Sequence, residues 1–257
     1  MKLASDLRRR LTSDDAIVGS WLALGDCAVS EIMARAGFDF LVIDLEHAPT
    51  SPETAAAMIR VIDLAGCCPL VRVAEFSPAQ IKQVLDAGAH GIIVPNVQNA
   101  KQAQAIVRST RFPPAGTRGV GLHRAQGYGS SFDEYLESCA DGLLIAVQIE
   151  SMTGVQNIDE IVSVEGIDAV LVGPYDLSAD LGIPGEFQSL IFTAAVQRVL
   201  EGATARGVAT GVHVVEPDPA GLRENIRKGH RFLVYSVDMR ILETGARLGA
   251  LSLTSKP

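Results

Sequence analysis

The sequence predicts a single parallel (β/α)8 barrel. Eight short runs of apolar and β-branched residues alternate with segments whose apolar residues recur at helical spacing. The chain has 257 residues, of which 47% are hydrophobic, so it can fill one large core. No linker interrupts the series, and eight units fit a closed barrel better than an open doubly wound sheet. We expect residues 1–257 to form one domain, with a C-terminal helix packing on a neighbouring subunit.

The expected elements alternate along the whole chain. Strands are predicted at residues 16–24, 39–44, 69–73, 90–95, 143–149, 168–172, 208–213 and 231–236. Helices are predicted at residues 28–36, 52–65, 78–87, 100–109, 155–162, 187–206, 219–228 and 239–248. Two of these helices have a proline near the start, Pro52 and Pro78, and four have a glycine just past the end, Gly37, Gly88, Gly207 and Gly229.

One long stretch, residues 110–131, shows neither pattern. A loop of this length in a compact domain is commonly functional or disordered, and we expect a lid or a subunit contact. Its glycines do not form a phosphate-binding loop, because they lack a Gly-Lys-Ser/Thr sequence and no strand directly precedes them.

Composition excludes several classes of function. The net charge of −8 and the pI near 5.1 argue against a nucleic-acid surface, which needs clustered lysine and arginine. Charges interrupt every apolar run before it reaches the about 18 residues of a membrane span, and no signal peptide is recognisable, so we expect a cytoplasmic protein. The cysteines (Cys27, Cys67, Cys68 and Cys139) lack the spacing of a zinc site or a disulfide framework and are interpreted as packing residues.

Two carboxylates stand where predicted strands end. Glu150 follows the strand at 143–149, and Asp176 comes shortly after the strand at 168–172. Consecutive parallel strands emerge at the same end of a barrel, so the two side chains should lie close together. Oxygen ligands suit Mg²⁺ or Mn²⁺, which leave coordination positions for substrate and water. The alternative is that each carboxylate caps the helix that follows it.

Other polar residues are predicted at the same end, where barrel enzymes place their active sites. His47 could transfer a proton near neutral pH, with its ring oriented by Asp44 or Glu46, or it could merely cap the next helix. Arg72 closes an apolar strand, so its charge must meet either an anionic substrate or a protein carboxylate. The remaining strand ends present Gln148, Gly173, His213, Ser236 and Asp238.

Six motifs are spread in order over most of the chain, from about residue 19 to residue 249. They are IDLEHAP at 43–49, VRV at 71–73, PNVQNA at 95–100, RFPPAGTRGVG at 111–121, VQIE at 147–150 and GPYDLS at 173–178. Together they resemble the HpcH/HpaI family of metal-dependent (class II) pyruvate aldolases. Members of this family cleave a 4-hydroxy-2-oxo acid, such as a 2-keto-3-deoxy sugar acid or 4-hydroxy-2-oxoheptanedioate, into pyruvate and an aldehyde.

The resemblance implies a barrel of the phosphoenolpyruvate/pyruvate-domain type that assembles as a homohexamer. It implies that Glu150 and Asp176 hold Mg²⁺, Mn²⁺ or Co²⁺. It also implies that Arg72 faces the keto oxygen of pyruvate and that His47, oriented by Asp44, handles proton transfer. The substrate-binding residues it implies are Gln148, Gly173, Pro174, Tyr175, Trp21, His213 and Asp86, of which Asp86 would reach the site of a neighbouring subunit.

The expected chemistry agrees with these residue types. Retro-aldol cleavage leaves electrons on the pyruvate enolate, and a metal ion and a guanidinium neutralise the oxygen where that charge develops. No lysine occupies a predicted strand end, which argues against a Schiff-base mechanism.

Two residues depart from the family pattern and leave the aldehyde undefined. Tyr175 stands where a small residue is common, and His213 stands where an aliphatic residue is common. Two other functions stay open. One is decarboxylation of an oxaloacetate-type substrate at the same site, in preference to acyl-CoA cleavage, for which the chain lacks extra length. The other is a non-catalytic barrel that binds a 2-oxo acid.

Overall fold

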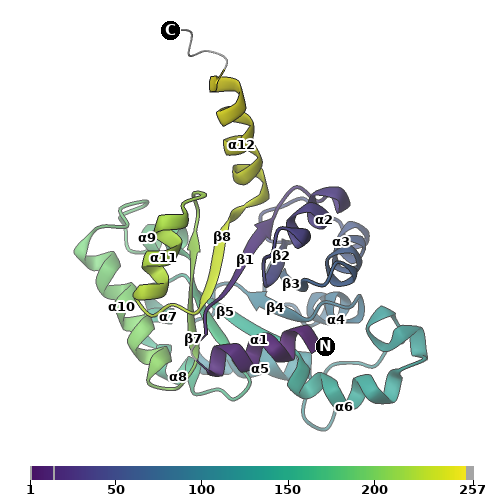
Figure 1. Cartoon of the computed structure of the whole chain (residues 1–257). Helices are drawn as coiled ribbons and strands as arrows, with labels where there is room; N and C mark the ends of the chain where they lie inside the picture. The colour runs from purple at the N-terminus through teal and green to yellow at the C-terminus, as the bar shows by residue number, and fades with distance from the viewer. Residues whose placement is uncertain (1, 14, 253–257) are drawn as a thin grey trace.

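The computed structural model describes residues 2–13 and 15–252 and shows a closed barrel of eight parallel strands (Figure 1). The strands are β1 (Ile17–Leu22), β2 (Phe40–Asp44), β3 (Cys68–Arg72), β4 (Gly91–Val94), β5 (Leu144–Ile149), β6 (Ala169–Val172), β7 (Ala209–Val214) and β8 (Phe232–Val237). Each strand pairs with the next in the chain, and β8 pairs with β1. The predicted fold class and all eight predicted strands are confirmed.

Helices surround the strands, as the alternating pattern predicts. They are α2 (Cys27–Arg35), α3 (Pro52–Leu64), α4 (Pro78–Asp86), α5 (Ala100–Thr110), α7 (Met152–Gln156), α8 (Ile158–Val162), α9 (Pro174–Asp180), α10 (Leu190–Thr204) and α11 (Pro219–Arg227). Of these, the short helix α9 was not predicted. The helix predicted at 155–162 is in fact the pair α7 and α8, which are separated at Asn157. The helix predicted from residue 187 begins at Leu190, because the Ser189 side chain caps it.

The strands separate two apolar layers, because successive side chains point to opposite faces. Phe40 of β2 points into the barrel and stacks on Phe232 of β8, with 4.7 Å between ring centroids. Gly19 lies beside this pair, and a β-carbon there would overlap the Phe40 ring, so only glycine fits. The next residues of β2, Leu41 and Ile43, belong instead to the layer between strands and helices.

A helix that the sequence analysis missed, α1 (Lys2–Thr12), closes the N-terminal end of the barrel (Figure 1). Its Ala4, Leu7 and Leu11 are buried and belong to the same cluster as the side chains inside the barrel. An ion pair from Arg8 to Asp168, at 2.6 Å, ties the helix to the loop before β6. The arginine-rich sequence of α1 obscured its narrow apolar stripe.

The stretch predicted as irregular, residues 110–131, contains one short 3₁₀ segment, η1 (Arg124–Gly129), and leads into another helix that was not predicted, α6 (Phe132–Gly142). Phe112, Tyr135 and Cys139 form a small buried cluster that holds this region together. It is therefore an ordered, packed segment outside the barrel.

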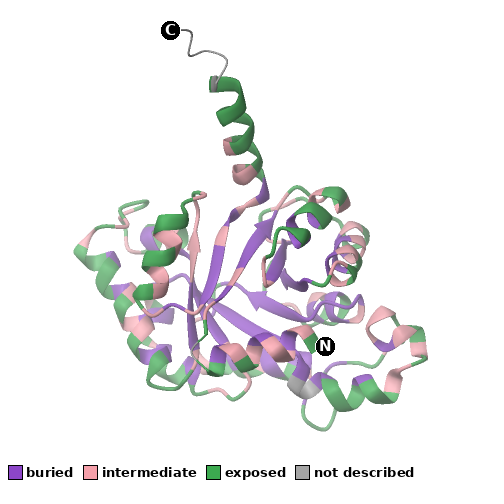
Figure 2. Ribbon diagram, in the orientation of Figure 1, coloured by how far each residue is buried: buried purple, intermediate pink, exposed green. Residues whose placement is uncertain are grey.

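The last helix, α12 (Asp238–Ser252), projects from the end of β8 away from the barrel (Figure 1). Figure 2 shows that most of its surface is exposed, and the exposed side chains include Met239, Leu242, Leu248 and Leu251. Within the described part of the chain, no helix combines the length and apolar character needed to cross a membrane.

Candidate active site

A cavity of about 260 Å³ lies at the carboxyl ends of the strands. Every site residue predicted from the sequence lines it except Asp86: Trp21, Asp44, His47, Arg72, Gln148, Glu150, Gly173, Pro174, Tyr175, Asp176 and His213. These residues follow different strands, and closure of the barrel brings them to one place.

Arg72, the last residue of β3, is fixed in this cavity by two carboxylates and an indole ring. Its Nε and Nη2 atoms donate to the two oxygens of Asp44 at 3.0 and 2.8 Å, and its Nη1 lies 3.0 Å from Oε2 of Glu46. The guanidinium carbon sits 4.3 Å above the centre of the Trp21 ring. Arg72 therefore pairs with protein carboxylates, which is one of the two possibilities that the sequence left open. Its side chain also lines the cavity, where an anionic substrate could reach it.

Glu150, directly after β5, is buried among groups that oppose its charge. Burial, followed by the nearby charges of Glu46 and Asp176, raises its pKa to about 7. The backbone N–H of Asn96 donates to Oε2 at 2.9 Å, and Gln148 Nε2 donates to Oε1 at 2.6 Å.

Asp176 lies in the first turn of α9, exposed at the mouth of the same cavity. Neither it nor Glu150 is a helix cap, because the cap of α7 is Ser151 and that of α9 is Gly173. The capping alternative is thus excluded for both carboxylates.

The donor set at Glu150 and Asp176 fits a hard divalent cation. It consists of carboxylate oxygens, and a cation between them would offset the repulsion that burial intensifies. The Oε1 atom of Gln148 is also buried without a partner. Among the side chains that the structure describes, no group of three His, Cys, Asp or Glu residues that could hold a metal ion is found. A divalent ion held by two carboxylates would leave positions for substrate or water.

His47 does not have the partner that the resemblance assigns to it. Asp44 turns its Oδ1 to the backbone N–H groups of Glu46 and His47, at 3.0 and 3.4 Å, and its carboxylate binds Arg72. The acid nearest the His47 ring is Glu46, with 3.9 Å between His47 Nε2 and Glu46 Oε2. In this structure the guanidinium holds both Asp44 oxygens, and the acid beside the His47 ring is Glu46, the alternative that the sequence left open; orientation of the ring by Asp44 stays a prediction.

His213 and Tyr175 also line the cavity. His213 packs edge-on against Trp21, with 5.9 Å between ring centroids, and its Nε2 lies 3.2 Å from the carbonyl oxygen of Ser236. Burial, and secondarily Arg72, lowers the pKa of His213 to about 4, so its ring is neutral at pH 7. Tyr175 is 56% exposed and packs edge-on against Phe187.

Comparison with known proteins agrees with this geometry. The profile described as "HpcH/HpaI aldolase/citrate lyase" matches residues 18–243. The chain belongs to the HpcH/HpaI family. It is 38% identical over 247 residues to a 4-hydroxy-2-oxo-heptane-1,7-dioate aldolase of Escherichia coli, with 93% of each protein covered.

Two solved structures superpose on almost the whole chain. An HpcH/HpaI aldolase/citrate lyase family protein from Burkholderia cenocepacia superposes with a TM-score of 0.93 at 35% identity, covering 98% of this chain and all of the other. The citrate synthase SbnG superposes with a TM-score of 0.83 at 30% identity, covering 97% of this chain and 96% of its own.

Asp86 lies outside the cavity of this HpcH/HpaI chain. It is the last residue of α4, and Arg118 Nη2 donates to its Oδ1 at 2.7 Å. The Arg118 side chain is fully buried, with the ring of Phe112 at 4.7 Å and the hydroxyl of Tyr135 at 2.9 Å. A role for Asp86 in a neighbouring subunit's site stays a prediction.

Glu46, which the sequence offers as the alternative to Asp44 for orienting His47, is not among the predicted catalytic and binding residues. It contacts both Arg72 and His47, and burial, together with the charges of Asp44 and Asp176, raises its pKa above the ordinary value. Its place between Asp44 and His47 at a strand end was the available signal. By contrast, the strand-end residue Asp238 is structural, because its carboxylate accepts from the backbone N–H groups of Ala23 and Leu24.

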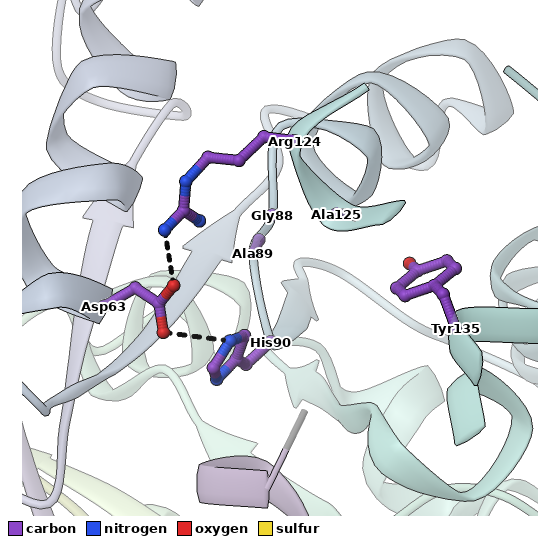
Figure 3. A pocket seen from close by; sticks show the side chains of 7 residues that line it. All are labelled: Asp63, Gly88, Ala89, His90, Arg124, Ala125 and Tyr135. Carbon is purple, nitrogen blue, oxygen red and sulfur yellow. Dashed lines mark hydrogen bonds and ion pairs between the residues drawn. The ribbon is translucent and has the colours of Figure 1, made fainter. Parts of the chain in front are cut away.

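A second polar cluster lies near the opposite end of the barrel, where His90 precedes β4 (Figure 3). Asp63 accepts from Arg124 Nη2 at 2.5 Å, and its other oxygen lies 3.2 Å from His90 Nε2. The cluster borders a hollow of about 310 Å³ that also meets Tyr135. Arg124 belongs to η1, so this cluster anchors the 110–131 segment to the barrel.

Proposed function

We propose that this chain is a divalent-metal-dependent aldolase that reversibly cleaves a 4-hydroxy-2-oxo acid into pyruvate and an aldehyde. The observation that carries the proposal is the convergence of Arg72 with the Glu150 and Asp176 carboxylates on one cavity. Family membership and relatives named as 4-hydroxy-2-oxo-heptane-1,7-dioate aldolases support it.

The reaction needs one base and one site for negative charge. The C4 hydroxyl gives up its proton, its oxygen becomes the aldehyde carbonyl, and the C3–C4 bond breaks. The electron pair of that bond passes to the enolate of pyruvate, and a proton added at C3 completes pyruvate. Reversal of these steps makes the bond, so no oxidant or reductant is required.

Arg72 would stabilise the enolate oxygen without having to move. Asp44 and Glu46 hold its guanidinium and Trp21 covers one face, so the charge is aimed before substrate arrives. Glu150 and Asp176 would hold Mg²⁺, Mn²⁺ or Co²⁺, and the ion, when bound, supplies positive charge next to the 2-oxo acid oxygens. Gln148 and the backbone at Gly173 to Tyr175 would bind the carboxylate of the 2-oxo acid.

His47 would accept the C4 proton, directly or through water. Its side chain is 64% exposed at the cavity, so it can exchange protons with solvent. Glu46, rather than Asp44, would orient the ring.

The proposed enzyme acts as a homo-oligomer, which we propose to be a hexamer. Projecting α12 leaves Leu242, Leu248 and Leu251 without cover, and packing on a neighbouring subunit would bury them. The same arrangement would let Asp86 approach the site of a neighbour.

The deciding experiment follows pyruvate released from 4-hydroxy-2-oxoheptanedioate. Activity should stop with EDTA, return with Mn²⁺, and fall by at least about 100-fold in Glu150→Gln, which should also lose Mn²⁺ binding by calorimetry. Glu201→Gln, a matched change at an exposed acid of α10, should alter neither. Full activity in EDTA would refute the metal role.

The assay also separates the two alternatives. Release of CO₂ from oxaloacetate with no cleavage of any 4-hydroxy-2-oxo acid would favour the decarboxylase. Binding of pyruvate and Mn²⁺ without turnover of either substrate would favour the non-catalytic barrel.

A further inference from the structure

A second and larger cavity, of about 650 Å³, adjoins the reaction cavity. The two share part of their lining, namely Val172, Pro174, Tyr175, His213 and Val215. One side-chain layer therefore separates the proposed reaction centre from this space, and nothing in the proposed chemistry uses it.

The cavity exists because the helix layer is loosely packed over β7. The helix α11 has no fully buried residue, so it does not fill the space beside α10. Side chains from α10 and the preceding loop line the cavity with apolar surface: Phe187, Phe192, Val196 and Leu200. A cavity of this volume with apolar and aromatic side chains in its lining is suited to an alkyl or aryl group.

Two side chains that differ in how tightly they are held, Tyr175 and His213, form the boundary between the two cavities. Tyr175 is 56% exposed, and its contact with Phe187, 5.0 Å between ring centroids, is an edge contact at the surface. His213 is held by Trp21 and by the Ser236 carbonyl oxygen. Rotation of Tyr175 would join the two spaces without disturbing the barrel.

The electrostatics of the second cavity favour an uncharged occupant. His230 and His213 both line it, and burial lowers the pKa of each to about 4, so both are neutral at pH 7. The charged groups of the lining, Glu216 and Lys228, are exposed, and Glu216 is paired with Arg240 at 2.6 Å. No charged group in the described lining is buried, so an apolar chain would not have to cover a buried charge there, although polar side chains such as Gln188 and Asn225 also border the cavity.

We propose that the aldehyde-derived end of the substrate passes Tyr175 and His213 and occupies this second cavity, so that the enzyme selects aldehydes with a long alkyl or aryl group. This inference rests on the proposed aldolase function and specifies its substrate class. In the synthetic direction, the pyruvate enolate carbon bonds to the aldehyde carbon and the aldehyde oxygen takes up a proton. The alkyl or aryl group stays unreacted in the second cavity.

The test measures aldol addition of pyruvate to acetaldehyde, hexanal and phenylacetaldehyde by the Mn²⁺-loaded full chain. The wild-type kcat/KM should be at least about tenfold higher for hexanal and phenylacetaldehyde than for acetaldehyde. Val196→Phe narrows the second cavity at a position that does not line the reaction cavity. It should lower kcat/KM for hexanal about tenfold and leave that for acetaldehyde within about twofold.

Two further variants make the result decisive. Leu200→Phe, one turn along α10, lines the same cavity and should repeat the effect if Val196→Phe folds poorly by circular dichroism. Ile191→Phe places the same ring on α10 in a different hollow and should change neither activity. Equal loss with both aldehydes, or no loss with hexanal, would overturn the inference while the aldolase function stands. No addition to any aldehyde, acetaldehyde included, would overturn both.

Discussion

Gly173 lies against the carboxylate of Glu150 so closely that a β-carbon at position 173 would overlap it. The absence of a side chain at the start of α9 is therefore what leaves room for the buried carboxylate. We expect Gly173→Ala to displace Glu150 and to weaken Mn²⁺ binding about tenfold or more, measured by calorimetry. Gly119→Ala, whose β-carbon would meet only Lys82 at an ordinary contact distance, should leave the affinity unchanged. Unchanged binding in Gly173→Ala would mean that Glu150 is not a ligand.

Asp44 is expected to contribute to stability through its buried pairing with Arg72. In Asp44→Asn the guanidinium keeps Glu46 but loses a bidentate partner at a site shielded from water. The free energy of unfolding should fall by about 3 kcal/mol in urea titrations. Asp159→Asn removes the exposed pair with Arg198 and should cost less than about 1 kcal/mol. Equal losses would show that burial does not strengthen the Asp44 pair.

Asp63 should make stability depend on strongly acid pH. Burial alone would raise its pKa, but hydrogen bonds from His90 and Arg124 outweigh that and lower the pKa from 3.8 to about 2. The folded state thus releases this proton more readily, so the stabilisation is present above pH 3.8 and disappears as pH falls through about 2. The side chain is 25% exposed, so we discount the effect to about 2 kcal/mol.

Urea titrations between pH 5 and pH 2 measure this contribution. Asp63→Asn should be less stable than wild type at pH 5, and the difference should vanish near pH 2. Glu134→Gln, at an exposed acid of α6, should follow the wild-type curve. A difference that persists unchanged at pH 2 would argue against an ionised Asp63 as its source.

His230 should produce a second pH dependence in a milder range. Burial, followed by the charges of Lys228 and Arg231, lowers its pKa from 6.5 to about 4. The unfolded chain therefore takes up this proton first, and stability is complete above pH 6.5 and declines as pH falls towards 4. A shift of this size corresponds to about 3 kcal/mol. His213 has the same shift, and Glu150, whose pKa is raised, opposes both histidines in this range, so His230→Gln should reduce the loss of stability between pH 6.5 and pH 4 by about 3 kcal/mol in urea titrations. An unaltered slope would contradict the assignment.

The exposed leucines of α12 should be needed for assembly. A charge at the centre of the apolar stripe, as in Leu242→Asp, should convert the oligomer to smaller species in light scattering coupled to gel filtration. Arg247→Gln changes an exposed polar residue of the same helix and should leave the assembly intact. A monomeric wild-type protein would refute the packing of α12 on a neighbour.

The barrel could be predicted because its signals are local. The apolar run before Glu150 indicates a buried strand without reference to any other part of the chain. Pro52 and Pro78 mark the starts of α3 and α4, because proline suits the first turn of a helix. Parallel order then places strand ends together, which is why Arg72 and Asp176 could be assigned to one site from sequence.

The remaining features depend on contacts between distant residues. Whether Asp44 binds Arg72 or the His47 ring is decided by side-chain geometry across β2 and β3, and no spacing in the sequence encodes it. The helix α1 was missed because it is stabilised by the packing of three buried residues against the base of the barrel, which the local sequence does not indicate. Likewise, Asp86 is held by Arg118, which is 32 positions away in the sequence, and no local pattern indicates that pairing.

The closure of the barrel base by α1 also separates stability from catalysis. Ala4, Leu7 and Leu11 cover the apolar interior at one end of the barrel, whereas the residues of the proposed site lie at the carboxyl ends of the strands. Changes at these three positions should therefore affect folding while leaving every group of the proposed site in the chain.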